Sequence, residues 1–321
     1  MRYRVVVVAA VLAAVVRVPA QGPRPDVGNQ FVVLGTASGP NSEAARAQPA
    51  NALVAGGQVY LVDAGDGAVG QLAKAGFRLP AVRGVFLSHL HFDHTGGMLA
   101  VLGLRMQLEV RGTLRVFGPP GTRALVDGLL AASAPAMRAG YGIAGQSWTA
   151  AVEVVELRDG ATIAVDAFKV TAAVNSHFSR PEGDASEPDG VSLSYRFDLP
   201  DRAIVYTGDT GPSPRVVALA RDADLLVSEM LDADAVLATM RPAGAATSSA
   251  QAPTGFEWHL RAHHMTPWQV GELAAAAKVR RLVITHFAPN VTSPEQEQRY
   301  RDAIRMRFPG DVAIAHDLDR F

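Results

Sequence analysis

The chain has 321 residues, of which 48% are hydrophobic and 19% charged, so it can bury a large core and is not a disordered chain. Its net charge of −1 offers no basic field for nucleic acid. The absence of cysteine excludes disulfides, thiolate metal sites and cysteine nucleophiles, so any metal ion must be held by histidines and carboxylates.

The first residues predict a secretory signal peptide. MRYR is positively charged, residues 5–16 are apolar, and RVPA ends in the small residue Ala20. The apolar run is too short to span a bilayer comfortably, so we expect no stable membrane anchor and a periplasmic or secreted protein. Cleavage after Ala20 removes three arginines and changes the net charge to −4. The alternative is that this run is a buried strand of the first domain.

Residues 21–321 are expected to form one domain in two similar halves. Apolar runs bounded by turn residues predict strands at 31–37, 50–67 (a hairpin around Gly56-Gly57), 82–88 and 113–118, with helices at 69–76, where Asp66 or a nearby residue is the cap, and 121–132. Further strands are predicted at 167–177, 191–199, 203–210, 224–230 and 281–287. Helices at 266–278 and 293–308 each open with a capping-box pattern. This order predicts two packed sheets with helices outside them.

The stretch SHLHFDHTGG, residues 88–97, follows one of these strands and predicts a metal site. His89 and His91 are two apart in a loop and can chelate one ion, whereas the adjacent Asp93 and His94 can be directed at a second. Polar residues also end later strands, and strand ends can converge at one edge of a sheet sandwich. The predicted ligand set is His89, His91 and His177 for the first ion, Asp93, His94 and His286 for the second, and Asp209 as a bridge. Two zinc ions are expected, although manganese or iron would accept the same ligands.

At these residues the sequence resembles the metallo-β-lactamase superfamily. SHLHFDHTGG matches its metal-binding signature, Asp63 in YLVDAGDG matches the aspartate ahead of it, and NSHF, YTGDT and ITHFAP look like the later ligand motifs. The resemblance covers nearly the whole chain after residue 20. It implies an α/β fold, the αββα four-layer sandwich. Asp63 is expected to support a ligand rather than bind metal directly.

A narrower resemblance is to the ribonuclease Z branch, whose pattern arylsulfatase-like secreted members share. HMTPWQVGELAAAAKVRRLVITHFAP, residues 264–289, looks like its C-terminal block, in which His264 takes the histidine position. Glu229 in LLVSEM matches the glutamate that partners it. A Glu–His pair can hold a proton for a leaving oxygen, so the resemblance implies catalytic roles for His264, Glu229 and Asp93, which can also orient the water. His259, His263 and His316 are expected to be structural or surface residues.

The expected function is that of an exported di-zinc hydrolase that cleaves a phosphodiester or sulfate ester of a small molecule by metal-bound hydroxide. Residues 133–148 contain one arginine and no lysine where ribonuclease Z carries a basic tRNA-gripping arm, so nucleic acid is disfavoured as a partner. The alternatives are a tRNA 3′-processing endoribonuclease, a lactone or β-lactam hydrolase, and a non-catalytic metal-binding protein of the cell envelope. The pocket walls fall in residues 133–148 and 232–262, so the sequence names neither the substrate nor the oligomeric state.

Overall fold

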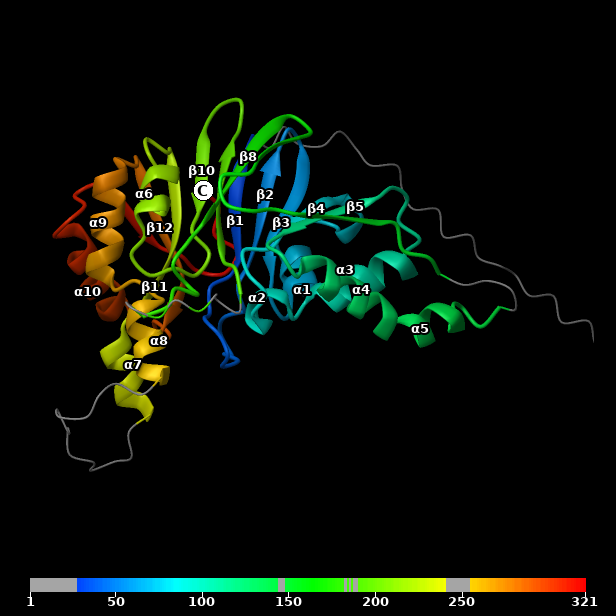
Figure 1. Ribbon diagram of the computed structural model, residues 1–321, viewed down its shortest axis with the longest axis horizontal. Helices are drawn as coiled ribbons and strands as arrows, with labels where there is room; N and C mark the ends of the chain where they lie inside the picture. The colour runs from blue at the N-terminus through cyan, green and yellow to red at the C-terminus, as the bar shows by residue number, and fades with distance from the viewer. Residues whose placement is uncertain (1–27, 144–147, 182–183, 185, 187–189, 241–254) are drawn as a thin grey trace, which may run out of the picture.

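Two β-sheets lie face to face, with helices on the outer side of each, in the computed structural model (Figure 1), which describes residues 28–143, 148–181, 184, 186, 190–240 and 255–321. The first sheet has the order β1-β2-β3-β4-β5-β6, antiparallel from β1 to β3 and parallel from β3 to β6. Its strands are β1 (Gln30–Gly35), β2 (Ala50–Ala55), β3 (Gln58–Ala64), β4 (Val82–Phe86), β5 (Leu114–Gly118) and β6 (Val152–Glu156).

The second sheet has the order β13-β12-β11-β10-β9-β8-β7, antiparallel from β7 to β10 and parallel from β10 to β13. Its strands are β7 (Thr162–Val165), β8 (Phe168–Val174), β9 (Leu193–Asp198), β10 (Ala203–Tyr206), β11 (Leu225–Leu231), β12 (Arg281–Ala288) and β13 (Asp311–Ile314). The inner parallel strand β11 is buried along its whole length because both of its faces are covered.

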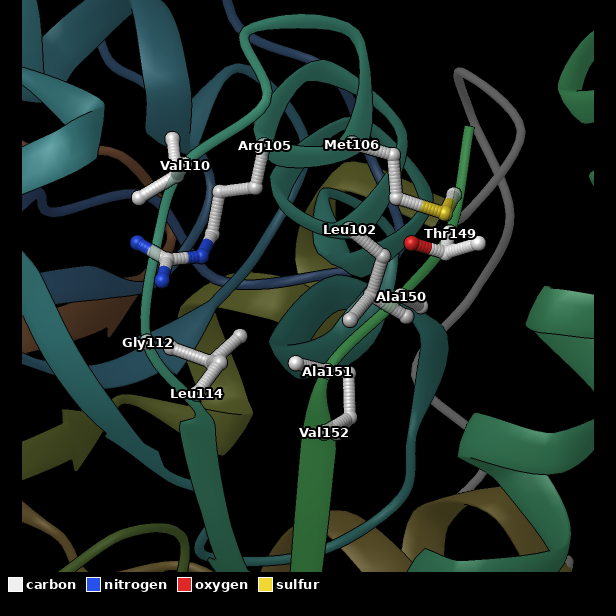
Figure 2. Close-up of a pocket in the computed structure, with 10 residues that line it drawn as sticks. All are labelled: Leu102, Arg105, Met106, Val110, Gly112, Leu114, Thr149, Ala150, Ala151 and Val152. Carbon is white, nitrogen blue, oxygen red and sulfur yellow. The ribbon is translucent and has the colours of Figure 1, made fainter. Parts of the chain in front are cut away.

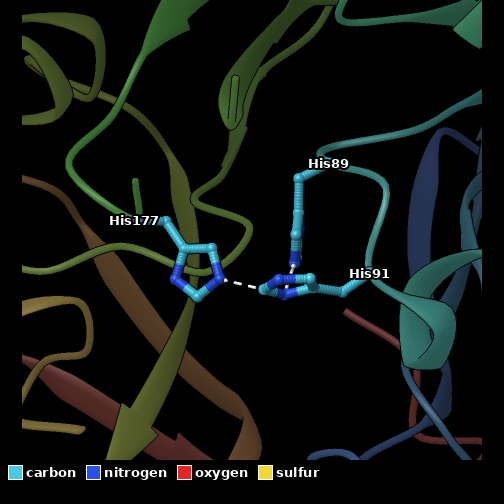
Figure 3. Close-up of side chains that lie close together, drawn as sticks. All are labelled: His89, His91 and His177. Carbon is cyan, nitrogen blue, oxygen red and sulfur yellow. Dashed lines mark hydrogen bonds between the residues drawn. The ribbon is translucent and has the colours of Figure 1, made fainter. Parts of the chain in front are cut away.

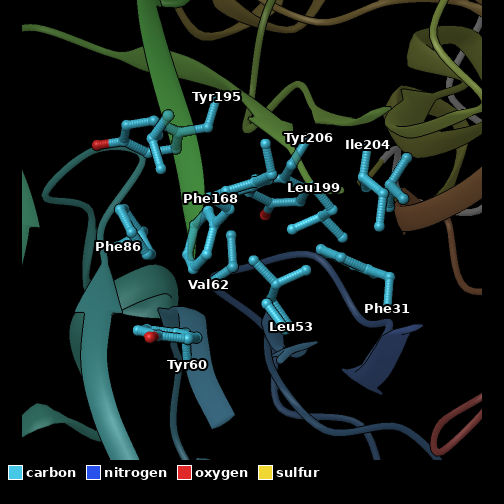
Figure 4. Close-up of a cluster of buried hydrophobic side chains, with 14 of the residues drawn as sticks. Phe31, Leu53, Tyr60, Val62, Phe86, Phe168, Tyr195, Leu199, Ile204 and Tyr206 are labelled. Carbon is cyan, nitrogen blue, oxygen red and sulfur yellow. The ribbon is translucent and has the colours of Figure 1, made fainter. Parts of the chain in front are cut away.

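An aromatic core fills the space between the sheets (Figure 4). Phe86 of the first sheet stacks on Phe117 with ring centroids 4.7 Å apart and meets Phe197 of the second sheet edge-on at 5.2 Å. Both arrangements are favourable for aromatic pairs. The central core therefore joins the halves into one folded unit.

Each sheet has its own outer core beneath a layer of helices. The first sheet is covered by α1 (Ala68–Lys74), α3 (Met98–Gln107) and α4 (Thr122–Ala132), and the second by α6 (Pro214–Leu219), α9 (Pro267–Ala277) and α10 (Pro294–Arg305). The remaining helical segments are η1 (Leu79–Ala81), α2 (Phe92–Thr95), α5 (Ala134–Ala139), α7 (Ala233–Met240) and α8 (Gly255–Ala262). The predicted αββα sandwich is confirmed.

The predicted caps of α9 and α1 can be compared with the structure. The capping box at the start of α9 is present in full, with Thr266 accepting from the Gln269 amide and Gln269 accepting from the Thr266 amide. Of the two options for the cap of α1, Asp66 or a nearby residue, the structure has the neighbouring Gly67, at φ 78° and with no side-chain bond. Only glycine adopts that backbone conformation without strain.

The predicted signal peptide at residues 1–20 lies outside the described residues, as do parts of the stretches 133–148 and 232–262. Within the part of the chain that is described, we find no helix with the length and apolar character needed to cross a membrane.

Candidate metal centre

The predicted ligands come together at one edge of the sandwich, where strands from both sheets end. His89 follows β4, His177 follows β8 and Asp209 follows β10, while His286 lies near the end of β12. The short helix α2 carries Asp93 and His94. Because the carboxyl ends of neighbouring parallel strands meet at the same sheet edge, residues far apart in the sequence share this one place.

Three histidines form a first group, called here the imidazole cluster: His89, His91 and His177 (Figure 3). The Nε2 atom of His89 lies 3.0 Å from Nδ1 of His91, and Nε2 of His177 lies 3.2 Å from the same Nδ1. His89 and His177 are buried, whereas His91 is exposed. Nitrogen atoms so placed can bind one shared cation.

Four residues form a second group, called here the carboxylate cluster: Asp93, His94, Asp209 and His286. Nε2 of His94 lies 3.3 Å from Oδ1 of Asp209, and Nε2 of His286 lies 3.3 Å from Oδ2 of Asp209. Asp209 also faces the imidazole cluster, because its Oδ2 is 3.9 Å from Nε2 of His89. Asp209 thus lies between the two clusters, and its role as a bridging ligand stays a prediction.

Unsatisfied polar atoms show that these residues fit a bound metal. Nε2 of His94 and Oδ1 of Asp209 are both buried, yet the structure gives neither atom a hydrogen-bond partner of acceptable geometry. A buried polar atom without a partner is unfavourable, whereas a cation between these atoms would satisfy both.

Asp63 contacts the carboxylate cluster through the Nδ1 side of His94. Its carboxylate accepts hydrogen bonds from the Ser88 amide (2.7 Å), the Ser88 hydroxyl (2.8 Å) and the Tyr206 hydroxyl (2.7 Å). It also lies 2.7 Å from Nδ1 of His94, which fixes that ring and leaves Nε2 for the ligand position. Asp63 is not among the residues of either cluster.

Glycine permits the close approach that fixes Asp93. The Gly39 amide donates to Oδ2 of Asp93 at 3.0 Å, and a Cβ atom on residue 39 would collide with the Asp93 side chain. Any larger residue at position 39 would therefore displace this carboxylate.

The charges of the two clusters differ. Burial, and then the neighbouring His94, holds the pKa of His89 well below its ordinary value, so this ring is neutral. Burial also lowers the pKa of His94, but the carboxylates Asp209 and Asp93 outweigh it and hold that pKa well above the ordinary value. The same carboxylates that raise the pKa of His94 would attract a metal cation to the carboxylate cluster.

Glu229 and His264 form the predicted pair beside both clusters. Nδ1 of His264 lies 3.1 Å from Oε2 of Glu229, and both side chains are buried. Oε1 of Glu229 accepts from the Met265 amide at 2.9 Å. Burial raises the pKa of Glu229, and although burial lowers the pKa of His264, the Glu229 charge outweighs this and raises it. Both shifts favour a proton held between the two side chains.

From the sequence, His259 is expected to be a structural or surface residue, but its ring lies beside those of His177 and His264. One ring nitrogen of His259 lies within 4.8 Å of one nitrogen of His177 and of His264. His259 lies on α8 and precedes His263 by four residues, so helical spacing already puts these two rings on one face. The spacing alone does not predict that this face of α8 lies against the metal centre.

A small surface pocket elsewhere carries no comparable chemistry (Figure 2). It lies between α3 and the amino ends of β5 and β6, away from the edge where His89 follows β4. Its one charged side chain, Arg105, already donates to the carbonyl oxygens of Leu79 and Val82.

The chain matches a model of a known protein family and is similar to named proteins. A family model described as "Beta-lactamase superfamily domain" matches residues 58–287. Ribonuclease Z of Mycobacterium sp. (strain KMS) is 30% identical over 296 residues, which cover 91% of this chain and 95% of that protein. Ribonuclease Z of Mycobacterium avium (strain 104) is 31% identical over 299 residues, covering 91% and 97%.

Two solved structures show the same fold. The metallo-β-lactamase fold protein YhfI from Bacillus subtilis has a TM-score of 0.66 at 19% identity, covering 91% of this chain and 98% of that chain. The short form of human tRNase Z has a TM-score of 0.62 at 21% identity, with coverages of 91% and 98%.

These relatives correct one expectation from the sequence. A small-molecule ester as substrate, with nucleic acid as a poor partner, is wrong, because the relatives matched over nearly their whole length are named as ribonucleases. The expectation rested on net charge and on one arginine in residues 133–148. Net charge averages over the whole molecule, whereas cations held by the two clusters would create a local positive field for phosphate.

Proposed function

The chain belongs to the β-lactamase superfamily, in its ribonuclease Z branch, and from that premise we propose that it cleaves phosphodiester bonds near the 3′ end of tRNA precursors. It is a metal-dependent hydrolase. The observation that carries the proposal is the Glu229–His264 pair, because a metal-binding protein without catalytic activity needs no proton donor beside its ions. The full-length similarity to ribonuclease Z proteins supports RNA as the substrate.

Two divalent ions held by the two clusters would supply a water of lowered pKa and neutralise charge on the scissile phosphate. Zinc is the expected ion, since the donor set is histidine nitrogen and aspartate oxygen. Oδ2 of Asp93 accepts from the Gly39 amide and also faces His94 and His286, so this carboxylate is placed where it would orient such a water.

His264 protonates the leaving oxygen. Its Nδ1 atom is held by Glu229, so Nε2 is the atom that carries the transferable proton toward the substrate. Glu229 keeps the imidazole charged until the proton leaves, and its own contact with the Met265 amide fixes its position. A positioned acid of this kind contributes about 10²–10⁴-fold to a rate.

Phe92 offers a contact for an RNA base. It lies between His91 and Asp93 in the sequence, and its side chain is 89% exposed, which is unusual for a phenylalanine. An exposed aromatic ring beside a phosphate-binding centre can stack on a base, a contact worth about 1–3 kcal/mol.

Export and sulfate-ester cleavage remain predictions from the sequence, without support from these relatives. The substrate alternatives differ in the bond that is cut. A panel of substrates offered to one sample of known metal content can therefore distinguish them.

The test uses the full chain loaded with Zn²⁺ or Mn²⁺ and a precursor tRNA labelled at its 3′ end. We expect a discrete 3′ fragment, its loss after chelation, and its return when metal is restored. The same sample receives p-nitrophenyl sulfate, a lactone and a β-lactam, and its metal content is measured by mass spectrometry. Intact RNA with both clusters loaded, together with hydrolysis of one of those other substrates, would refute the proposal.

A further inference from the structure

The histidines of this chain are concentrated at one place. Two of them beyond the predicted ligands and His264, namely His259 and His263, lie beside the same edge, and among all nine only His316 is elsewhere. His259 is 5.4 Å from His177 and 5.2 Å from His264 between ring centroids.

A chain of hydrogen bonds fixes which nitrogen of His259 is free. Nε2 of His263 lies 2.8 Å from the Ser179 carbonyl oxygen, which can only accept, so this nitrogen carries the proton. Nδ1 of His263 is then an acceptor, and it lies 2.8 Å from Nδ1 of His259, which must donate. A neutral His259 is left with its lone pair on Nε2.

The two neighbouring rings are fixed in the same way. Nδ1 of His177 lies 3.1 Å from the His263 carbonyl oxygen and donates to it, and Nδ1 of His264 is held by Glu229. The free nitrogen of each ring is therefore Nε2. One nitrogen of each ring lies within 4.8 Å of one nitrogen of each of the others.

We propose that His177, His259 and His264, called here the imidazole triad, form an additional zinc position next to the two clusters, filled when zinc is in excess. Three imidazoles, each with Nδ1 bonded to a fixed acceptor, match the way in which proteins orient histidine ligands of zinc. Zinc is the fitting cation because the triad offers only imidazole nitrogens, which magnesium and calcium disfavour, and zinc takes the place of the proton on Nε2 of His264 when it binds.

Occupation of the triad inhibits the enzyme. His177 can serve only one ion through Nε2, so an ion in the triad competes with the imidazole cluster for this ligand. The triad therefore binds zinc more weakly than the clusters do. The ion also takes Nε2 of His264, the proton donor, and this part of the inference rests on the proposed function.

The direct test is a crystal structure of the zinc-loaded full chain, soaked in excess zinc and recorded at the zinc absorption edge. We expect an anomalous peak about 2.0–2.1 Å from Nε2 of His259 and of His264. The peak should be absent in His259→Gln, while the peaks at the two clusters persist. Cluster peaks without a triad peak in the wild type, or a triad peak that survives in His259→Gln, would overturn the proposal.

A kinetic test uses the same variants. Excess zinc should inhibit the wild type, and His259→Gln should raise the half-inhibiting zinc concentration at least about tenfold, the scale on which lost contacts around a ligand weaken metal binding. His316→Gln is the matched control, because His316 lies on the surface against Glu297, and it should leave inhibition unchanged. Equal inhibition of all three proteins would contradict the proposal, whereas failure of the proposed function alone would leave the crystallographic result intact.

Discussion

The imidazole cluster and the carboxylate cluster are neighbours that share Asp209, yet they differ in charge and in access. The imidazole cluster consists of neutral rings, and its His91 is exposed. The carboxylate cluster is more deeply enclosed, with Asp63, Asp93 and Asp209 around His94. Because its two carboxylates, with Asp63 behind them, attract a cation more strongly than neutral rings do, we expect the carboxylate cluster to fill first and release its ion last.

Removing the residue that the clusters share should have the largest effect. Asp209→Ala takes a ligand from both, so activity should fall below about 0.1% of wild type, since metal ions supply several kcal/mol of transition-state stabilisation. Metal content should fall in the same sample. Asp127→Ala, which changes an exposed residue of α4, should behave like wild type. An Asp209→Ala enzyme with full metal content would show that the clusters bind independently of this carboxylate.

His264→Ala should separate chemistry from metal binding. It belongs to neither cluster, so kcat should fall about 10²–10⁴-fold while both ions stay bound. Mass spectrometry on the assayed sample checks the metal content. Loss of an ion would place His264 among the ligands of one cluster. The difference between the two clusters would then have to include this residue.

Asp63→Asn should weaken one cluster and spare the other. The amide cannot accept from all four donors that now surround the carboxylate, so His94 loses its fixed orientation. We expect about 10–100-fold weaker metal binding at the carboxylate cluster. Titration against a competing chelator resolves the two sites. Equal weakening at both clusters would mean that they act as one unit.

Glu229→Gln should give the smallest effect, a shift of the pH profile. In the wild type, burial lowers the pKa of His264 but Glu229 outweighs it, so the acid form persists above the ordinary value of about 6.5. Activity that needs this acid is present at lower pH and is lost as the pH rises through the raised pKa. In the variant the attraction is gone, so the alkaline limb of kcat should move to lower pH. An unmoved limb would exclude His264 as the titrating acid.

Local spacing explains what the sequence could predict. His89, His91, Asp93 and His94 lie within a stretch of six residues that follows β4, and His177, Asp209 and His286 lie at or just after the ends of strands, so sheet geometry brings them together. The position of His259 depends on how α8 packs against the rest of the site, which no local pattern encodes. The sequence left the cap of α1 open between Asp66 and a nearby residue, and a left-handed glycine at residue 67, without a side-chain bond, takes that place.

Two residues of the metal centre have strained backbone conformations. Asp63 and His286 have left-handed backbone angles, φ 57° and φ 44°, which cost a residue other than glycine about 1–3 kcal/mol each. Bound metal offsets such a cost by stabilising only the folded chain, by about 2.7 kcal/mol at a hundredfold excess over Kd. Metal-starved cells should therefore contain less of this protein, because the apo chain unfolds more often and is degraded by proteases. The supply of metal would then set the abundance of the enzyme as well as its activity.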